Sequence, residues 1–366
     1  MIPFVDLKAQ YQSIKEELDA AMQEVIEKTA FIGGAYAAQF EKEFAAYLGV
    51  EHCIACANGT DSLEILLQVL GVGAGDEVIV PAISWISTSE AVSSLGGTPV
   101  FVDIDPTYYT LDLQQVEAAI TDKTKVIIPV HLYGQPVDMP QLMEIANKHG
   151  IKVLEDCAQA HGATVNGQKI GTFGHCASFS FYPGKNLGAY GDAGGMVTND
   201  AEIAKIARRI ANHGQEGKHN HLMEGRNSRL DGLQAAVLSV KLPYLEQWTA
   251  ARIANANNYD QLLANSGLTL PKVLNKGKHV FHLYVIRSQE RDALMERLEE
   301  KNIGTAIHYP TALPFLTCYQ DRGYTKEDFP VAYQVTKEIL SLPMYAELTK
   351  EQQEEVVACL QSLTTA

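Results

Sequence analysis

Short apolar runs alternate with amphipathic stretches over the first two-thirds of the chain. The apolar runs have the length of strands buried in a sheet, and several stretches between them place apolar residues on one helix face. In one such stretch Leu142, Ile145 and Ala146 share a face behind a helix start at Asp138 and Pro140. The predicted strands are 53–57, 77–80, 100–104, 125–130, 152–155, 177–182 and 194–198, and the predicted helices are 61–70, 86–95, 139–148 and 200–212.

The order of these elements predicts the fold class. Strands that alternate with helices are typical of a doubly wound, mostly parallel α/β sheet. Beyond residue 230 the pattern changes to a long helical stretch over 231–260, interrupted by Pro243. It is followed by a strand over 280–286, a helix over 289–301, a short strand over 305–308 and a final helix over 349–362. We therefore expect a large α/β domain over residues 1–245 and a smaller C-terminal α+β domain over residues 246–366.

Composition and charge narrow the class of protein. The chain has 366 residues, of which 46% are hydrophobic and 20% charged, as in globular proteins of about two domains. Its 29 basic and 44 acidic side chains leave a net charge of −15. Broad binding to nucleic acid or to an anionic membrane surface needs a basic face, so this balance argues against both. A small anionic substrate needs only a local group of donors, and the charge does not exclude it.

The sequence also bears on location and redox state. The first residues lack the basic and apolar regions of a signal peptide, and no apolar run is long enough for a transmembrane helix. We therefore expect a cytoplasmic protein whose six cysteines are reduced thiols. Cys53 and Cys56 form a C-x-x-C pair inside an apolar, strand-like run. Because residues three apart on a strand face opposite sides, we expect both to pack in the core rather than serve metal or redox chemistry.

A turn with anion-binding features follows the first predicted strand. It reads Ala-Asn-Gly-Thr-Asp-Ser over residues 57–62 and leads into a helix. Asn58 or Thr60 can cap that helix, and Gly59 allows a ligand to approach the backbone. Free N–H groups and the helix dipole would then form an anion site. An ordinary capped turn explains the same residues.

Two ionisable residues follow strands farther along the chain. Asp156 comes directly after the strand over 152–155, and the carboxyl end of a strand is where ligands bind in an open α/β sheet. Its carboxylate suits a cationic ring nitrogen, and it equally suits a helix cap. Lys185 stands in a Pro-Gly turn after the alternating Ser/Phe strand over 177–182, with glycines beyond it. Most lysines are surface charges, but burial at such a place lowers the pKa of the amine and favours imine formation.

These pieces fit one cofactor. Pyridoxal phosphate needs a lysine to bind its aldehyde and an acid to keep its pyridine nitrogen protonated. It also needs a nest of donors for its phosphate and an aromatic ring against its face. Lys185, Asp156 and the turn over 57–62 supply the first three. Trp85, which follows the strand over 77–80, supplies the fourth.

Six runs of sequence carry a resemblance to a known family. In chain order they read ANGTDSLE, PAISWIST, EDCAQAHG, SFSFYPGKNLGAYGDAGG, EGRNSRLDGLQAA and GTAIHYP. Taken together they resemble the DegT/DnrJ/StrS family of pyridoxal-phosphate sugar aminotransferases, over essentially the whole chain. The resemblance implies an aspartate-aminotransferase-like fold (fold type I) and a homodimer. It also implies a nucleotide-linked keto sugar as substrate and glutamate as amino donor.

The resemblance implies a role for each residue that matches a family motif. Lys185 would bind the aldehyde of the cofactor and move protons, and Asp156 would pair with the pyridine nitrogen. The remaining residues would contact the cofactor or the substrate. Gln159 would touch the ring. The phosphate would be held by Gly59, Thr60, Asp61 and Ser180, and Asn227 would reach it from the other subunit. The substrate side would be lined by Arg229, His308 and Tyr309.

Several alternatives remain open at this level. Family members with histidine in place of the lysine are sugar dehydratases, which the presence of Lys185 disfavours. His219 and His221 are spaced like metal ligands but lack a third, so we expect a polar loop near the mouth of the active site instead. The runs 212–215 and 224–229 resemble members that aminate C3 of a 3-keto sugar. Amination at C4, and a non-catalytic regulatory protein of the same fold, are the alternatives.

Overall fold

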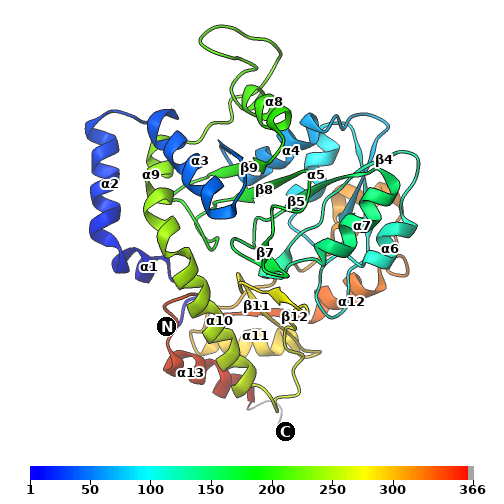
Figure 1. Cartoon of the computed structure of the whole chain (residues 1–366). Helices are drawn as coiled ribbons and strands as arrows, with labels where there is room; N and C mark the ends of the chain where they lie inside the picture. Colours follow the sequence, from blue (N-terminus) through cyan, green and yellow to red (C-terminus); the bar gives the residue numbers. More distant parts are fainter. Residues whose placement is uncertain (362–366) are drawn as a thin grey trace.

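The seven strands predicted for the first two-thirds of the chain form one sheet in the computed structural model, which describes residues 1–361 (Figure 1). They are β1 (His52–Cys56), β2 (Glu77–Pro81), β3 (Thr98–Val102), β4 (Thr124–Ile127), β5 (Lys152–Asp156), β8 (Cys176–Ser180) and β9 (Gly194–Thr198). Their order is β1-β9-β8-β5-β4-β2-β3. β9 is antiparallel to both of its neighbours, while the other neighbouring pairs are parallel. The predicted doubly wound, mixed sheet is confirmed.

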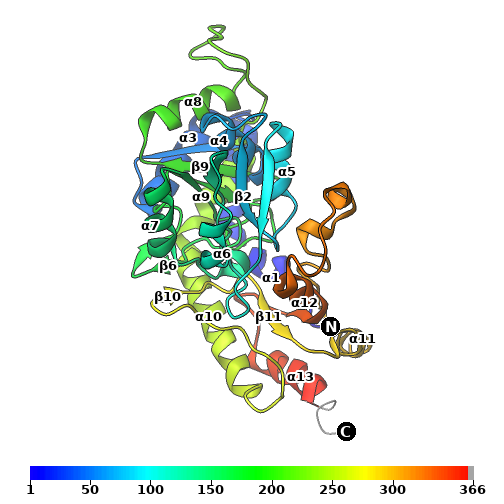
Figure 2. The ribbon, with the colours of Figure 1, turned by 90° about the vertical axis from the view of Figure 1, so that its right-hand side faces the viewer.

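Helices cover both faces of this sheet (Figure 2). One face is covered by α4 (Gly59–Val69), α5 (Ser87–Ser94) and α8 (Ala201–Ala211). The other face is covered by α3 (Gly34–Leu48), α9 (Gly232–Lys241), α6 (Leu113–Ala118) and α7 (Met139–His149). Cys56 packs in the core on the first face and Cys53 in the core on the second. Both thiols are therefore core residues, as their spacing predicts.

Three helices precede the first predicted element, and the sequence pattern predicts none of them. They are α1 (Leu7–Ser13), α2 (Lys15–Glu27) and α3. In α2 the buried residues are Leu18 and Val25, so its apolar stripe is too narrow to recognise in the sequence. In α3 Phe40 and Phe44 lie one turn apart and meet Phe181 edge to face. That pair was a usable signal for a helix against the sheet.

The C-terminal part forms a two-stranded antiparallel sheet with helices around it. Its strands are β11 (Tyr284–Arg287) and β12 (Ile339–Leu342). The surrounding helices are η2 (Leu242–Tyr244), α10 (Leu245–Leu262), α11 (Arg291–Glu300), η3 (Leu313–Phe315), η4 (Thr317–Arg322), α12 (Pro330–Glu338) and α13 (Lys350–Gln361). Pro243 lies in the first turn of η2, where a proline needs no N–H partner, so the interruption is a 3₁₀ turn between α9 and α10. Within residues 1–361, no helix combines the length and apolar character needed to cross a membrane.

The predicted strand over 305–308 is wrong. Ala306 pairs with Ser341 in an isolated bridge. The chain then leaves the ladder, because His308 and Tyr309 contact residues that follow strands of the large sheet. β12, the strand that does pair with β11, has no predicted counterpart. The predicted end of the last helix at 362, and of the small domain at 366, lie outside the described residues.

Smaller elements join the two parts of the chain. β6 (Thr164–Val165) pairs with β7 (Gln168–Lys169) and also with β10 (Gly277–Lys278), which precedes the small sheet. At the N-terminus, Ile2 pairs with Ile303 after α11. The first residues therefore lie against the C-terminal part, although α1 and α2 extend along the large sheet's helices (Figure 1).

Candidate active site

Polar and aromatic residues lie together at one end of the large sheet, where the parallel strands have their carboxyl ends. Asn58 follows β1, Trp85 follows β2, Tyr133 follows β4, Asp156 ends β5 and Ser180 ends β8. Tyr133 lies in the short helix η1 (Leu132–Gly134). The carboxyl ends of parallel strands are where open α/β sheets bind ligands. The fold therefore brings the predicted residues Trp85, Asp156 and Ser180 to the same end of the sheet.

The N-terminus of α4 packs directly on the end of β8. Asn58 caps the helix, because its Oδ1 accepts a 2.8 Å hydrogen bond from the Asp61 N–H. A Cβ on Gly59 would lie 2.7 Å from Cβ of Ser180, so only glycine allows this approach. Thr60 Oγ1 lies 2.7 Å from Oγ of Ser87, the first residue of α5. The arrangement puts helix N–H groups and hydroxyls together, which is a site for an anion such as a phosphate.

Asp156 is a buried carboxylate held by two donors. Oδ1 accepts from the Ala158 N–H at 3.1 Å, and Oδ2 accepts from the Thr88 hydroxyl at 3.0 Å. Burial raises the pKa of this carboxyl above its ordinary value, and the two hydrogen bonds and the charge of Lys185 oppose that rise. Residues 157–163 form turns in which no helix begins, so the alternative of a helix cap is wrong. The carboxylate is available to a cation that enters the site.

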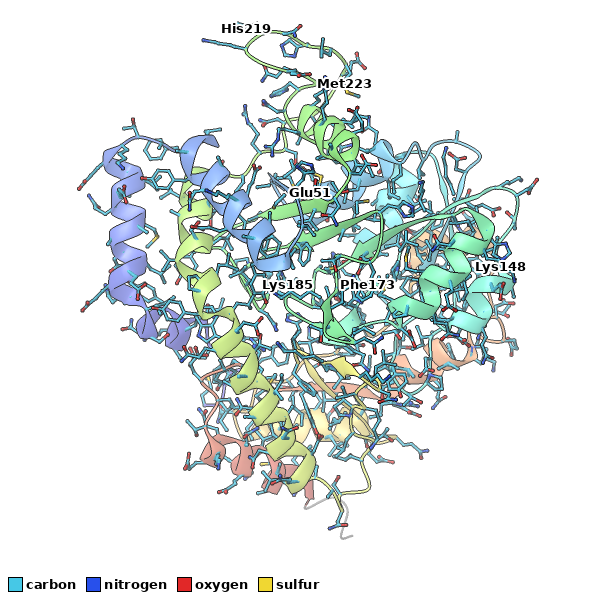
Figure 3. The ribbon with its side chains drawn as sticks, viewed as in Figure 1. Glu51, Lys148, Phe173, Lys185, His219 and Met223 are labelled. Carbon is cyan, nitrogen blue, oxygen red and sulfur yellow. The ribbon has the colours of Figure 1, made fainter. Side chains whose placement is uncertain are left out.

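Lys185 lies in the turn after β8, in the centre of the molecule (Figure 3). Its N–H donates to the Tyr182 carbonyl at 2.8 Å, which closes the turn. Burial lowers the pKa of the amine to about 8, and the charge of Asp156 opposes this shift. A lysine in this state is partly neutral near pH 8, and the neutral amine is the nucleophile that attacks an aldehyde.

Gln159 connects the sheet edge to the C-terminal part. Its Oε1 accepts from the Tyr133 N–H at 2.7 Å, and its Nε2 donates to the Tyr309 hydroxyl at 3.0 Å. The Tyr133 hydroxyl donates to the carbonyl of His308. Burial lowers the pKa of His308 to about 4, so its imidazole is neutral at physiological pH. The predicted residues Gln159, His308 and Tyr309 thus form one cluster, which also contains Tyr133, a residue that the sequence did not single out.

Trp85 lies at the outer side of this cluster. Its indole is 58% exposed, and its ring centre lies 5.7 Å from that of Tyr309 at a tilt of 45°. An exposed indole beside the Tyr309 ring offers a flat apolar surface to a ring that enters the site. The residues present therefore fit pyridoxal phosphate at each of its four points of contact: aldehyde, ring nitrogen, phosphate and ring face.

Comparison with known proteins identifies the family. The chain matches the model of the DegT/DnrJ/EryC1/StrS aminotransferase family over residues 12–361. The chain belongs to this family. A pleiotropic regulatory protein of Geobacillus stearothermophilus is 46% identical over 97% of this chain and 96% of its own length. A protein of Acidithiobacillus ferrooxidans, named UDP-N-acetyl-3-dehydro-alpha-D-glucosamine 3-aminotransferase, is 43% identical over 96% of this chain and 95% of its own.

Solved structures agree with this assignment. S. venezuelae DesV in complex with a ketimine intermediate has a TM-score of 0.97 and 40% identity, covering 100% of this chain and 99% of that one. Bacillus subtilis ntda with bound cofactor PMP has a TM-score of 0.90 and 34% identity, over 97% of this chain and 82% of that one. The PLP form of Spr1654 from Streptococcus pneumoniae has a TM-score of 0.91 and 26% identity, over 96% of both chains. The predicted family, fold class, enzyme class and cofactor are confirmed.

Two predicted residues of the aminotransferase lie on the segment between α8 and α9, which contacts the turn before α4. Asn227 is exposed, and its backbone pairs with that of Asn212 after α8. The next residue, Ser228, accepts a 3.2 Å hydrogen bond from the N–H of Ala57, directly before the helix cap. Arg229 is partly buried, and its Nε is a buried N–H without a hydrogen-bond partner. Neither Asn227 nor Arg229 follows a strand of the large sheet, so the strand ends by themselves do not point to these two residues.

The loop with His219 and His221 projects from the end of α8 away from the body of the aminotransferase (Figure 3). Within one chain the loop lies away from Lys185 (Figure 3). Its expected place near the mouth of an active site stays a prediction. His221 Nδ1 lies 2.8 Å from the carbonyl of His213, inside the loop. His221 thus supports the conformation of the loop, and no third ligand is grouped with the two histidines among residues 1–361.

One cluster in the described chain has the side chains of a metal site, namely His131, Glu155 and Cys157. Glu155 already accepts from the N–H groups of Gly171, Phe173 and Gly174 at 2.7–2.8 Å. His131 Nδ1 accepts from the Val137 N–H, which leaves its Nε2 to donate to Glu155 at 3.1 Å. These hydrogen bonds engage His131 and Glu155 and anchor the loop that carries Tyr133.

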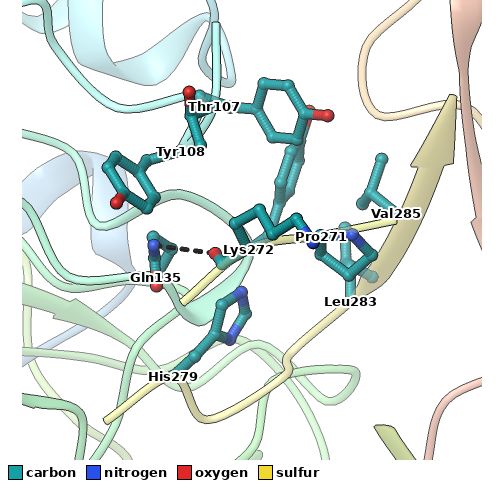
Figure 4. A pocket seen from close by; sticks show the side chains of 10 residues that line it. Thr107, Tyr108, Gln135, Pro271, Lys272, His279, Leu283 and Val285 are labelled. Atoms are coloured by element: carbon teal, nitrogen blue, oxygen red, sulfur yellow. Dashed lines mark hydrogen bonds between the residues drawn. The ribbon is translucent and has the colours of Figure 1, made fainter. Parts of the chain in front are cut away.

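A small cavity lies beside Tyr133, which is one of its lining residues (Figure 4). Tyr108, Gln135, His279 and Leu283 are among its lining residues. Gln135 donates from Nε2 to the carbonyl of Lys272 at 3.0 Å, while its Oε1 is buried without a partner. The cavity measures about 10 Å³, enough for about one water molecule. It is therefore not a second cofactor site.

Proposed function

We propose that this aminotransferase moves an amino group from glutamate to C3 of a nucleotide-linked 3-keto sugar. The observation that carries the proposal is the desolvated Lys185 within electrostatic reach of the buried Asp156, at the edge where α4 offers its N-terminus. The choice of C3 is supported by names of relatives. Besides the Acidithiobacillus protein, relatives that are 42–44% identical carry names with a 3-amino or a 3-oxo group on a dTDP- or UDP-linked sugar.

The residues of the cluster divide the work of this reaction. Pyridoxal phosphate, when bound, supplies an aldehyde carbon that accepts nitrogen and a ring that withdraws electrons. Lys185 would bind that carbon in the resting enzyme and carry a proton to and from the reacting carbon through its Nζ. Asp156 would hold a proton on the ring nitrogen, for which a buried carboxylate is well suited. Gly59, Thr60, Asp61 and Ser180 would hold the phosphate.

The substrate side would be formed by residues on the opposite side of Gln159. The hydroxyl of Tyr309 and the neutral imidazole of His308 present polar groups next to Trp85. Arg229 keeps a buried N–H without a partner, which is costly unless a ligand uses it. We propose that this guanidinium binds an anionic group of a substrate.

We further propose that the enzyme is a cytoplasmic homodimer with shared active sites. Ile26, Phe31 and Ile32 are apolar and exposed between 43% and 58% at the N-terminal helices. Contiguous exposed apolar patches, rather than single exposed side chains, mark surfaces that another chain covers, and these three residues are close in sequence. Asn227 has an exposed side chain, and the family resemblance gives it the role of completing the phosphate site of the second copy.

Absorbance spectroscopy of the purified enzyme with glutamate tests the function. Wild-type protein loaded with pyridoxal phosphate should show the absorbance band of the cofactor bound to Lys185, and glutamate should bleach it. Subsequent addition of a 3-keto nucleotide sugar should restore the band, and Lys185→Ala should show neither change. A wild-type protein whose band ignores glutamate would contradict the proposal.

Two other readings remain as candidates. A relative that is 46% identical is named a pleiotropic regulatory protein, which favours a regulatory role for the fold. The intact pair of Lys185 and Asp156 favours catalysis, because a protein that only bound a partner would have no use for a desolvated amine. Amination at C4 would use the same residues, and it differs only in how the sugar is oriented.

A further inference from the structure

A buried lysine contacts the turn that carries Lys185. Lys241, the last residue of α9, has no exposed surface. Its Nζ donates a 2.7 Å hydrogen bond to the carbonyl of Gly188 and lies 4.3 Å from the centre of the Tyr190 ring. Two neutral groups, a carbonyl and an aromatic face, thus take the place of water around this cation.

Stability alone does not explain a lysine at this position. Burying a charge against neutral partners is costly, and an apolar side chain of similar size is often at least as stable in such a place. Burial lowers the pKa of Lys241 to about 8, which reflects that cost. The charge of Glu347 offsets only part of it. The reason for a lysine at this position must therefore lie in the hydrogen bond that Lys241 makes with Gly188.

What Lys241 holds is the end of a tight turn. The Lys185 N–H donates to the Tyr182 carbonyl at 2.8 Å, and the Ala189 N–H donates to the Phe181 carbonyl at 2.8 Å. A Cβ on Gly188 would lie 2.3 Å from the Pro183 carbonyl oxygen, so the turn closes on itself without spare room. The buried carbonyl of Gly188 still needs a donor from outside the turn. Lys241 is that donor.

We propose that Lys241 is a positioning residue whose hydrogen bond to Gly188 fixes the turn so that Lys185 captures pyridoxal phosphate. The inference rests on the proposed role of Lys185. In the capture the Lys185 amine adds to the aldehyde carbon, a carbon–nitrogen double bond replaces the carbon–oxygen double bond, and water leaves. Without Lys241 the carbonyl of Gly188 must turn toward another donor, which moves Lys185 with it. Misplacing a reacting group by about 1 Å slows a reaction by up to about a hundredfold.

The test measures two properties of the apoprotein, its unfolding temperature and the rate at which it captures pyridoxal phosphate, followed by absorbance. Lys241→Met keeps the length of the side chain and removes the donor, and Lys241→Gln keeps a neutral donor. Lys169→Met is the matched control, because Lys169 also donates to a carbonyl and lies 3.8 Å from a tyrosine ring, that of Tyr47, but contacts no part of the turn.

We expect Lys241→Met to unfold near the wild-type temperature, since relief from a buried charge offsets a carbonyl without a donor. We expect Lys241→Met to capture the cofactor at least about tenfold more slowly than wild type. The capture rate of Lys241→Gln should lie between those of wild type and Lys241→Met, and Lys169→Met should capture the cofactor like wild type. Capture by Lys241→Met within about twofold of wild type, or a Lys241→Gln no faster than Lys241→Met, would overturn the proposal. A Lys241→Met chain that fails to fold would assign the residue to stability and overturn it too.

Lys185→Ala separates this inference from the proposed function. If Lys185→Ala loses capture while Lys241→Met keeps it, only the role of Lys241 is contradicted. If Lys185→Ala captures the cofactor like wild type, the role of Lys185 fails, and the inference about Lys241 fails with it.

Discussion

Burial acts on Lys185 and Asp156 in opposite directions, and both shifts favour cofactor chemistry. Desolvation penalises the charged form of each group, so it lowers the pKa of the amine and raises that of the carboxyl. Each group opposes the shift of the other through its own charge. The result is an amine that is ready to attack an aldehyde next to a carboxylate that gains from a nearby cation.

The pKa of Lys185 predicts how capture of pyridoxal phosphate depends on pH. Because the neutral amine reacts, the capture rate of the apoprotein should rise about tenfold per pH unit below pH 8 and level off above it. Stopped-flow absorbance between pH 6 and pH 10, about two units to either side of the pKa, measures this profile. A rate that keeps rising past pH 9.5 would indicate a lysine near its ordinary pKa of about 10.5 and would contradict the desolvated amine.

Asp156→Asn should bind the cofactor but react slowly with glutamate. Asparagine keeps the shape and the contact with Thr88 but cannot stabilise a positive charge on the ring nitrogen. A hydrogen bond to a charged group contributes about 1.5–3 kcal/mol, so single-turnover rates should fall roughly 10- to 150-fold. The unfolding temperature of the variant serves as the control for its fold. A variant that reacts within about twofold of wild type would remove Asp156 from the chemistry.

How well a residue of the site could be predicted depended on how local its signal is. Asp156 and Lys185 were recognised because each follows an apolar strand within a few residues. Thr88 and Tyr133 were not, because their contacts join positions 68 and 175 residues apart in the chain. Gln159, His308 and Tyr309 entered through the family resemblance alone. Hydrogen bonds between residues far apart in the chain are decided by the fold and leave no local pattern in the sequence.

At the scale of elements, the approach of α4 to β8 depends on a glycine. Gly59→Ala would place a Cβ 2.7 Å from that of Ser180 and push the helix N-terminus off the strand end. We expect a loss of about 1–3 kcal/mol in the free energy of unfolding, as for overpacking, together with weaker binding of pyridoxal phosphate. Thermal unfolding and a cofactor titration measure the two effects.

Gly73→Ala is the matched control for this prediction. Gly73 has no atom near the position of a new Cβ and no positive φ, so the same substitution there should change neither stability nor cofactor binding. Equal behaviour of the two variants would show that the close approach of α4 to β8 does not matter for the site.

The strands were easier to predict than the helices. Most strands of the large sheet contain short apolar runs, because helices cover both faces, while β8 alternates Ser and Phe. The helices α1 and α2 were not predicted, because α1 buries no residue and α2 buries only two, which leaves no clear apolar pattern in the sequence. The error at 305–308 has a different cause: the segment has the composition of a strand, but tertiary contacts draw His308 and Tyr309 to the site.

At the scale of the whole molecule, we propose a domain boundary at residues 245 and 246, where α10 leaves the large sheet. Arg252 of α10 is buried and donates to the carbonyls of Phe281 at 3.1 Å and Met344 at 2.9 Å. It thereby ties the segment before the small sheet to the segment after it. The site lies where these two parts meet, because Gln159 follows the large sheet and Tyr309 belongs to the C-terminal part.

A shared active site predicts that two inactive variants restore each other. We expect Lys185→Ala and Asn227→Ala to be impaired alone, because one lacks the amine and the other the residue proposed to reach the partner's phosphate. Mixed dimers should regain activity, since one of their two sites contains no substitution. Measured turnover after mixing, with dimer exchange confirmed by mass spectrometry, gives the answer. Confirmed mixed dimers without recovered activity would contradict shared sites.

The most direct test of the central claim follows the nitrogen itself. The holoenzyme is incubated with ¹⁵N-glutamate and nucleotide-linked 3-keto and 4-keto sugars, and the products are examined by mass spectrometry and NMR. We predict ¹⁵N attached to C3 of the 3-keto sugar, no label in the 4-keto sugar, and no transfer by Lys185→Ala. Label at C4, or no label in any sugar while the wild-type enzyme is folded and loaded with cofactor, would contradict it.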